Sequence, residues 1–377
     1  MRREYLLAEV MDGDREFVRQ VKAVESRASL RWNAASTAHL TVKDIDPVIP
    51  DLLADGARAA VWMITEDGGS VSQERLLEGG IGDVSGEGPK GTVTFPVVDD
   101  FDMLNEILGW QAPTAPITGQ SAAEYARYTG SSETRAKAAI QANVTRLGLP
   151  WTVAASLDRG SDGRTEFRMH KLLDRVIDPL IADRLQLTVE RDADTDTWLV
   201  DVSAGEVFPR PLTPQSGVLG KWKWVTRRET ATRVVVGGAG QAEAREFALV
   251  IDAAREAATN RIREVFVDAR MAEAGADLTP DGLQALAEGS AKAGITADLR
   301  ETSWFRFPSA YRLGDRVLIK IGSLEVEDVI TQIDITHNTR DGFRTVPKVG
   351  IATADPQERL VRSVQSLAAS VRNLEKR

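Results

Sequence analysis

The acidic run DADTD (192–196) alternates its carboxylates in the way that the start of a calcium-binding loop does. Such a loop converges alternate carboxylates on one ion, with glycine at its sixth position and a bidentate glutamate at its twelfth. In this chain Thr197 occupies the sixth position and Ser203 the twelfth. The run is therefore more typical of a solvated hairpin turn, and we predict no metal-binding residues.

The glycine-rich stretch VVVGGAG (234–240) is similar to a phosphate-cradling turn, in which glycines let the backbone approach a pyrophosphate at a helix N-terminus. Here Glu243 stands where the third glycine is needed, and it would set a negative charge beside the phosphates. Asp268 also lies too far along the chain to bind a ribose. We interpret the stretch as a strand that leaves its sheet through a loop, and we predict no cofactor. A nucleotide-dependent enzyme using Gly237–Gly240 stays open as an alternative.

Carboxylates occur side by side at Asp99-Asp100 and in the stretch 325–328, but acid–base catalysis depends on their separation in space. The sequence has no HExxH or GxSxG motif. Its histidines, His39, His170 and His337, lie far apart along the chain, and each suits a strand face or a helix surface. We therefore predict no catalytic residues. A cell-wall or glycan hydrolase that uses carboxylates not placed by the sequence remains an alternative.

Trp222 and Trp224 share one face of an expected strand, and Trp304 begins the strand-rich end of the chain. Aromatic side chains of this kind bind sugars when exposed, but they more often fill cores or interfaces. We interpret all three as core or interface residues. A carbohydrate-binding receptor module stays open as a further alternative.

The composition limits the classes of function. The net charge is −9, and the basic residues are scattered, whereas tight binding of nucleic acid needs a clustered cationic surface. No stretch approaches the roughly 18 apolar residues of a membrane helix, so we expect no membrane-spanning segment. Cysteine is absent, which excludes disulfides and indicates synthesis in a reducing cytoplasm. At 377 residues the chain is long enough for several packed units.

The elements that would position these groups are mainly strands. Residues 304–350 read as strand, tight turn, strand, turn and strand, with period-2 alternation over 316–321 and 331–336. Residues 1–112 also look rich in strands, followed by a short helix over 99–108. The strands expected in this first part are Glu4–Met11, Thr37–Lys43, Ala59–Thr65, Leu76–Val84 and Gly91–Val98.

The middle of the chain mixes helices and strands. An alanine-rich helix is expected over 132–147 and closed by Gly148, and helical spacing continues over 169–185 with Pro179 inside it. A hairpin follows. The remaining expected elements are the hairpin strands 185–190 and 197–202, the strands 231–236, 246–252 and 264–267, and the helices 253–260 and 280–294.

The last residues, 357–377, carry an a/d heptad seam with polar residues at most other positions. A seam of this kind favours self-association of the helices, and the alternative is one amphipathic helix lying on its own subunit. The residues predicted as an oligomer interface are Leu360, Val364, Leu367, Val371 and Leu374.

Taken in order, these pieces resemble the tail-hub (baseplate-hub) proteins of long-tailed bacteriophages, in the minor tail protein version of actinobacteriophages. The resemblance touches nearly the whole chain, although no single stretch carries a catalytic signature. The stretches that carry it are WNAASTAHLTVKD (32–44), ARAAVWMITEDG (57–68), GGIGDVSGEGPKGTVTFPVVDDFDMLNEILGW (79–110), RVVVGGAG with REFALVIDAAREA (233–257), and YRLGDRVLIKIG through DVITQIDITHN (311–338).

The resemblance implies an α+β, mainly β fold in which two small antiparallel β-barrel domains are joined by an α/β insertion. The expected units are a first hub domain (1–112), an α/β insertion domain (113–217), a second hub domain (218–352) with an α/β insert at about 241–300, and the heptad helix (353–377).

The same resemblance implies a structural function without catalysis. Three copies would form a ring that closes the tail tube of the virion at its tip, and the distal tail ring, the tape measure and tip or fibre proteins would be its neighbours. During host attachment and DNA ejection, the phage DNA would pass through the lumen without specific binding. A negatively charged wall would suit that passage because like charges repel.

Overall fold

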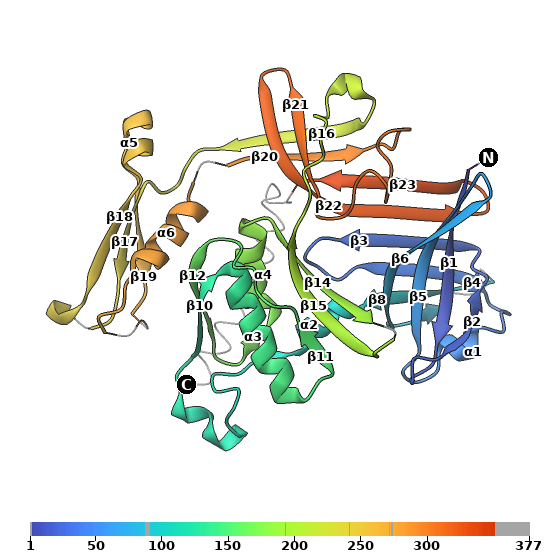
Figure 1. Cartoon of the computed structure of the whole chain (residues 1–377), viewed down its shortest axis with the longest axis horizontal. Coiled ribbons are helices and arrows are strands. Elements are labelled where there is room, and N and C mark those ends of the chain that lie inside the picture. Colours follow the sequence, from blue (N-terminus) through green and yellow to red (C-terminus); the bar gives the residue numbers. More distant parts are fainter. Residues whose placement is uncertain are drawn as a thin grey trace.

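The computed structural model describes residues 2–86, 91–192, 194–240, 242–270, 272, 274–290 and 292–350. These residues form a mainly β structure, which confirms the expected class, and three hydrophobic clusters pack within it. Figure 1 shows an elongated molecule, with the first and last strands at one end and a small α/β unit at the other.

The first part of the chain supplies strands to the main sheet. Alternation decides which side chains are inside: in β4, Ala38, Leu40 and Val42 are fully buried while the residues between them are not. The elements are β1 (Arg3–Met11), β2 (Phe17–Val21), β3 (Glu25–Arg31), β4 (Thr37–Lys43), α1 (Ile49–Leu52), β5 (Arg58–Asp67), β6 (Ser70–Ile81), β7 (Ser85–Gly86) and β8 (Thr92–Asp99).

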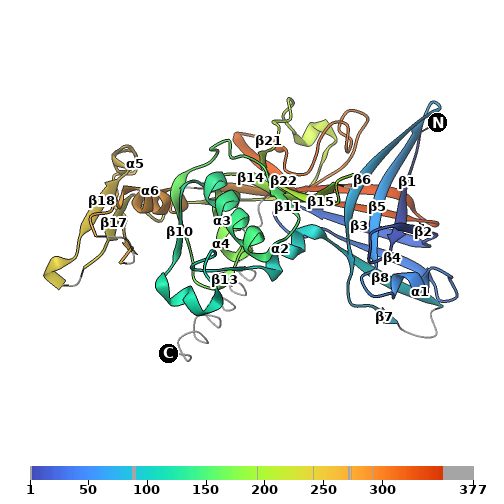
Figure 2. The same cartoon turned by 60° about the horizontal axis from the view of Figure 1, so that its bottom comes forward.

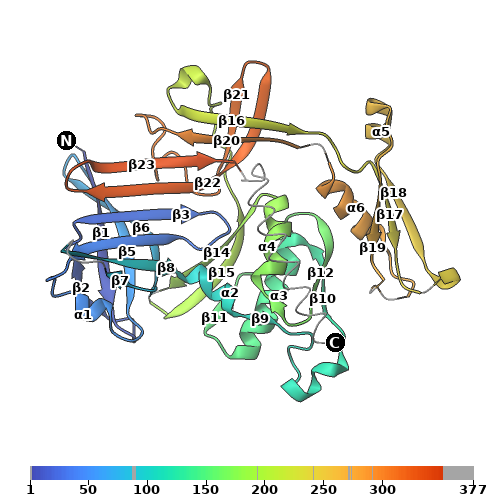
Figure 3. The same cartoon turned by 180° about the vertical axis from the view of Figure 1, so that it is seen from behind.

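The end of the chain completes the same sheet. β22 runs antiparallel to β3, with partners from Gln332↔Arg31 to Asn338↔Glu25, and Figure 3 shows the two strands side by side. The strands from this part are β16 (Leu219–Arg227), β20 (Lys292–Leu299), β21 (Arg316–Ile321), β22 (Leu324–Asn338) and β23 (Gly342–Val349).

This pairing yields one 13-stranded sheet in the order β16-β20-β23-β22-β3-β4-β8-β6-β5-β1-β2, with β21 on β22 and β7 on β8. Its buried side chains form one hydrophobic cluster drawn from both ends of the chain, Leu6 to Val349. Within the described ranges the sheet does not close on itself, since β16 and β2 are its two ends. Two separate barrels are therefore not confirmed.

The middle of the chain forms a second unit around its own cluster, from Phe101 to Val202. Figure 2 shows its helices packed beside the main sheet. Its elements are η1 (Asp100–Asp102), α2 (Met103–Glu106), β9 (Leu108–Gly109), η2 (Ile117–Ala122), β10 (Ala126–Ser131), α3 (Ser132–Leu147), β11 (Trp151–Val153), β12 (Asp162–Phe167), β13 (His170–Lys171), α4 (Leu173–Ala182), β14 (Leu185–Asp192) and β15 (Thr197–Ala204). The short η3 (Pro214–Ser216) follows between Leu212 and Val218, which belong to the main cluster.

Helix α3 spans the residues that the sequence predicts. The Ser131 hydroxyl accepts the Thr134 N–H at 3.2 Å and caps its start, and Gly148 ends it with φ 64°. The helix expected over 99–108 is shorter, because β9 pairs with β13 and leaves only η1 and α2 helical. Pro179 lies inside α4, which continues past it to Ala182.

The small unit is a three-stranded sheet, in the order β18-β17-β19, and it packs on α6. The helix expected over 280–294 ends at Glu288, and the next residues enter β20 because they pair with β16. The elements are β17 (Arg233–Gly237), η4 (Ala242–Ala244), β18 (Phe247–Ile251), α5 (Ala253–Thr259), β19 (Glu264–Asp268) and α6 (Thr279–Glu288). The domain limits expected from the sequence stay predictions.

Candidate interaction surfaces

The glycine-rich stretch is strand and loop. β17 continues into a loop with the single 3₁₀ turn η4 and then into β18, which runs antiparallel to it, so among the described residues no α-helix begins after the glycines. Gly238 is held against Leu278, since a side chain there would lie 2.7 Å from it, and Gly240 has φ +95°. The loop is thus shaped by packing against the α6 side of the small unit, and the helix N-terminus that a phosphate would need does not follow it.

The acidic run at 192–196 contributes Asp196 to a network of ion pairs. Asp196 accepts hydrogen bonds from Arg15 and from Arg191 Nε, the latter at 3.0 Å. Arg191 in turn donates to Glu78 at 2.8 Å. Nearby positive charge holds the pKa of Asp196 below its usual value, against the opposing effect of burial. The network joins the β14–β15 hairpin to the main sheet.

Asp99 and Asp100 have opposite surroundings. Asp100 accepts two hydrogen bonds from Arg58, at 2.6 and 2.7 Å, and one from Trp198 Nε1 at 2.6 Å. Burial, with a further contribution from Asp100, raises the pKa of Asp99 to about 6, although Ser36 N–H donates to its carboxylate. Neither carboxylate lines the hollow described below, so the pair joins packed elements and does not face a substrate site.

Glu327 of the stretch 325–328, His170 and His337 are likewise held by neighbours. Glu327 pairs with Arg184 and Arg316 at 3.1 and 3.3 Å. His337 Nδ1 accepts the Leu6 N–H at 3.4 Å, and His170 Nδ1 accepts the Arg168 N–H at 3.0 Å. These groups stabilise local strands and turns.

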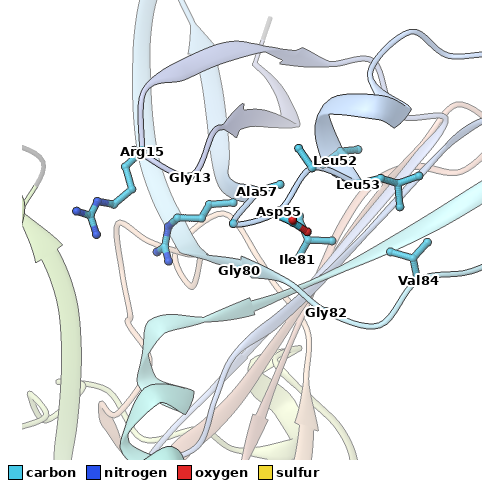
Figure 4. A pocket seen from close by; sticks show the side chains of 13 residues that line it. Gly13, Arg15, Leu52, Leu53, Asp55, Ala57, Gly80, Ile81, Gly82 and Val84 are labelled. Atoms are coloured by element: carbon cyan, nitrogen blue, oxygen red, sulfur yellow. The ribbon is translucent and has the colours of Figure 1, made fainter.

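A hollow of about 510 Å³ lies where the turn after β1 meets α1 and the end of β6. Figure 4 shows its lining, which consists mostly of glycines and apolar side chains and also includes Arg15 and Asp55. Arg15 binds Asp196, and Arg58, which also lines the hollow, binds Asp100. The two cations of the hollow are therefore engaged in the fold.

In the part of the chain that the structure describes, no group of three or more His, Asp or Glu side chains could hold a metal ion. None of the helices in those ranges has the length and apolar character that crossing a membrane requires.

The first candidate interaction surface is the β16 edge of the main sheet. Trp222 and Trp224 are 42% and 54% exposed, so of the two interpretations given from the sequence, core or interface, only interface remains for them. They lie opposite Ala297 and Ile295, which are buried in the main cluster. The two tryptophans therefore lie on the same face of the sheet as the buried core residues of β20, but on an edge strand where that face is open to solvent. Trp304, in contrast, is half-buried and stacks on Phe208.

The second candidate surface is one face of the small sheet. Alternation places Phe247, Leu249 and Ile251 of β18, with Phe266 of β19, on the face opposite α6. All four are exposed. Arg245 lies between the two aromatic rings, 5.7 and 5.3 Å from their centroids. We call this set the outer face. It was not predicted, although the continuously apolar run FALVI (247–251) indicated a strand with apolar side chains on both faces.

The sequence-predicted interface Leu360, Val364, Leu367, Val371 and Leu374 lies outside the described residues, and its role stays a prediction.

Comparison with known proteins identifies the family. The model of the family described as Siphovirus ReqiPepy6 Gp37-like protein matches residues 7–351. The chain therefore belongs to this family. A search of the curated proteins found no significant match.

Solved structures of tail proteins share the fold. The 43 kDa tail protein of prophage MuSo2 from Shewanella oneidensis is 14% identical, with TM-score 0.53 over 92% of this chain and 98% of that one. The tail protein from Neisseria meningitidis MC58 is 12% identical, with TM-score 0.50 over 92% and 96%. The prophage tail protein gp18 from Listeria monocytogenes EGD-e is 10% identical, with TM-score 0.51 over 96% and 99%. The expected kinship with tail proteins is confirmed.

Proposed function

We propose that this member of the siphovirus Gp37-like family is a structural hub of the phage tail tip, and that three copies form a ring without catalytic turnover. The observation that carries the proposal is the family match over residues 7–351. The fold shared with phage tail proteins along nearly the full chain supports it. The ring would close the tail tube, contact distal tail, tape-measure and fibre proteins, and let DNA pass.

The β16 edge supports an interface between copies in this ring. Edge strands offer unpaired backbone groups, and exposed aromatic side chains beside a core are favoured at interfaces. Trp222 and Trp224 combine both features, since β16 pairs only with β20 among the described strands. We therefore assign these two tryptophans to the contact between neighbouring copies.

Light scattering on the full chain tests the ring. The expected particle has three times the 41.1 kDa mass of one chain. The double variant Trp222→Ser with Trp224→Ser is expected to shift the particle to a single chain, because burial of large aromatic area is lost. Ile45→Ser, at an exposed position away from β16, is the matched control and should leave the mass unchanged.

Imaging of assembled tails covers the case in which copies associate only on the virion. The expected density at the tail tip has threefold symmetry. A single chain in solution together with a tip lacking threefold density would overturn the proposal. Clearing of host cell walls in a zymogram with the pure protein would overturn the absence of catalysis.

A further inference from the structure

The main sheet contains two sets of strands that repeat one pairing order. The first set has the order β3-β4-β8-β6, with β5 also on β6, and the second has β16-β20-β23-β22, with β21 also on β22. The members of both sets also follow one another in the same order along the chain. Each strand of one set therefore has a counterpart in the other, and the counterpart of β3 is β16.

The match extends to single backbone hydrogen bonds. In the second set, the Ile330 N–H donates to the Asp315 carbonyl at 2.8 Å, at the point where β22 leaves β21. In the first set, the Ile81 N–H donates in the same way to the Ala57 carbonyl at 3.2 Å, where β6 leaves β5. The stretch 82–86, which includes β7, is therefore the counterpart of the part of β22 that follows Ile330.

These two counterpart stretches differ in what lies on their free edge. After Ile330, β22 pairs with β3, and Ile333 lies opposite Leu30 in that ladder. No described strand pairs with 82–86 on the edge that faces away from β8. β16, the counterpart of β3, likewise pairs only with β20 among the described strands. The chain thus has one open edge of each kind, and the β22–β3 ladder is an example of how the two kinds fit together.

The hollow of about 510 Å³ lies at the open edge of 82–86. Within the chain, the corresponding place is filled by Trp32, which is 6% exposed and lies 3.4 Å from where a Cβ of Gly314 would be. Gly56 lines the hollow and is the counterpart of Gly314, since each precedes the acceptor of the matching hydrogen bond and each has positive φ, +76° and +89°. No aromatic side chain is among the described residues that line the hollow, as Figure 4 shows.

The pairing registers give the counterparts of the exposed tryptophans. Following the pairs across each set yields two matching rows: Ile330, Val349, Ala297 and Trp222 in the second set, and Ile81, Val97, Ala38 and Ala28 in the first. Trp222 is therefore the counterpart of Ala28, and Trp224 is that of Leu30. Ile333 of β22 has its counterpart in Val84, because the ladders of β7 and β22 keep the same register from these rows.

We propose that β16 of a neighbouring copy pairs antiparallel with 82–86 and that its Trp224 enters the hollow. This rests on the ring proposed above and names the surface that receives β16. Trp224 would lie opposite Val84, which lines the hollow, as Leu30 lies opposite Ile333 within one chain. Burying a tryptophan removes roughly 150–250 Å² from water. Because each copy offers β16 and receives at 82–86, the contact is head-to-tail, which is the kind that closes rings.

The charges at the two edges favour the same contact. β16 carries the exposed Lys221 and Lys223, whereas the exposed Asp55 lines the hollow and the exposed Asp83 lies between two of its lining residues. Opposite charges guide two surfaces into register. Pairing of β16 with a second β16 would instead bring the lysines of two copies together, and like charges across a strand pair are destabilising.

Disulfide trapping in the full chain tests the pairing, because the natural sequence has no cysteine to interfere. A chain with Val84→Cys and Trp224→Cys is expected to form covalent species of two and three chains under mild oxidation and none larger, because the ring closes at three. Val84→Cys with Lys223→Cys is the matched control and should cross-link severalfold less, since neighbouring residues of a strand point to opposite faces.

A charge placed at the hollow gives a second measurement. Leu53 lines the hollow and is 57% exposed, so Leu53→Arg is compatible with the fold of a single chain. The variant is expected to reduce the mass seen by light scattering from three chains to one, because the added cation meets the lysines of β16. Leu157→Arg, at a 66% exposed position of the middle unit, is the control and should keep the mass of three chains.

The outcomes separate this inference from the ring itself. A parent of three chains that shows no cross-link between positions 84 and 224, and keeps its mass in Leu53→Arg, would leave the ring in place and overturn the pairing. A parent of one chain without that cross-link would also overturn the pairing, and the ring would then depend on threefold density at the tail tip. Cross-linking through Trp224→Cys alone would assign β16 to a second β16 and overturn the pairing as well.

Discussion

Asp99 and Glu229 are acidic side chains whose pKa values move in opposite directions. Asp99 is largely buried, and this burial outweighs the hydrogen bonds from Ser36 and the Phe101 N–H, so its neutral form is favoured and its pKa rises to about 6. Glu229 accepts hydrogen bonds from Arg255, at 2.8 Å, and from Arg263, and these lower its pKa to about 2. Acidification therefore weakens the contact that ties Glu229 to α5, while it relieves the charge at Asp99.

Asp99→Asn should stabilise the protein at neutral pH. Between pH 4 and 6 the folded state binds more protons at this site than the unfolded state, so the contribution of Asp99 to stability falls as pH rises. Removing the charge should add about 1–2 kcal/mol to the free energy of unfolding at pH 7 and almost nothing at pH 4. Urea denaturation at both pH values measures this.

Asp67→Asn, at the exposed end of β5, is the control and should change stability little at either pH. If Asp99→Asn raised the free energy of unfolding by the same amount at pH 4 and pH 7, the charge of Asp99 would not be the cause.

At the scale of elements, alternation and capping made much of the fold predictable. The limits of β4 and α3 agree with the sequence, because each has a strict period and clear end signals. β3, with the polar sequence ESRASLR, was missed because only Ala28 and Leu30 mark its buried side as apolar. The end of the helix expected over 280–294 was wrong because pairing of β20 with β16 overrides local propensity.

Gly148→Ala should destabilise the protein through the end of α3. Gly148 has φ +64° and no atom within 4 Å of an added Cβ, so the cost comes from backbone strain and not from a clash. The expected loss is about 1 kcal/mol in the free energy of unfolding. Gly148→Asn should lose less, because asparagine tolerates this conformation better. Equal losses in the two variants would contradict the assignment to strain.

Arg191→Met should loosen the β14–β15 hairpin from the main sheet. The side chains of Arg191 and Glu78 are 8% and 7% exposed, so the change leaves a buried carboxylate without one of its donors. The expected loss is about 3 kcal/mol in the free energy of unfolding. Arg312→Met removes an exposed pair with Glu74 and should cost about 0.5 kcal/mol or less.

Chemical denaturation of both variants and the parent protein measures these losses. A loss at Arg191 no larger than that at Arg312 would mean that the network does not hold the hairpin.

At the scale of the whole molecule, the long-range pairing of β22 with β3 is the feature that sequence patterns could not give. Judged by its own pattern, each of the two strands suits a separate small barrel. Period-2 alternation predicts which side chains are buried but not which strand is the hydrogen-bonded partner. The ladder joins residues about 300 positions apart and merges both ends of the chain around one cluster. The exposure of Trp222 and Trp224 follows from the same topology, since β16 became an end of the sheet.

The merged sheet and the small unit should therefore open separately. The small unit has five buried residues in its cluster, Ala231, Val234, Val236, Ala272 and Leu278, whereas the main cluster draws on both ends of the chain. Amides in 233–268 should exchange with solvent hydrogen through an opening that needs several kcal/mol less than that of 25–31 and 330–338. The last two peptides should exchange together, because one ladder protects both.

Two variants sharpen the measurement by hydrogen-exchange mass spectrometry. Val234→Ala should speed exchange only in 233–268, while Ile333→Ala should speed it in both 25–31 and 330–338, because Ile333 is buried where β22 pairs with β3. If Ile333→Ala left 25–31 unchanged, the two ends of the chain would be independent units after all. The main sheet would then behave as the two separate domains that the resemblance to tail-hub proteins implied.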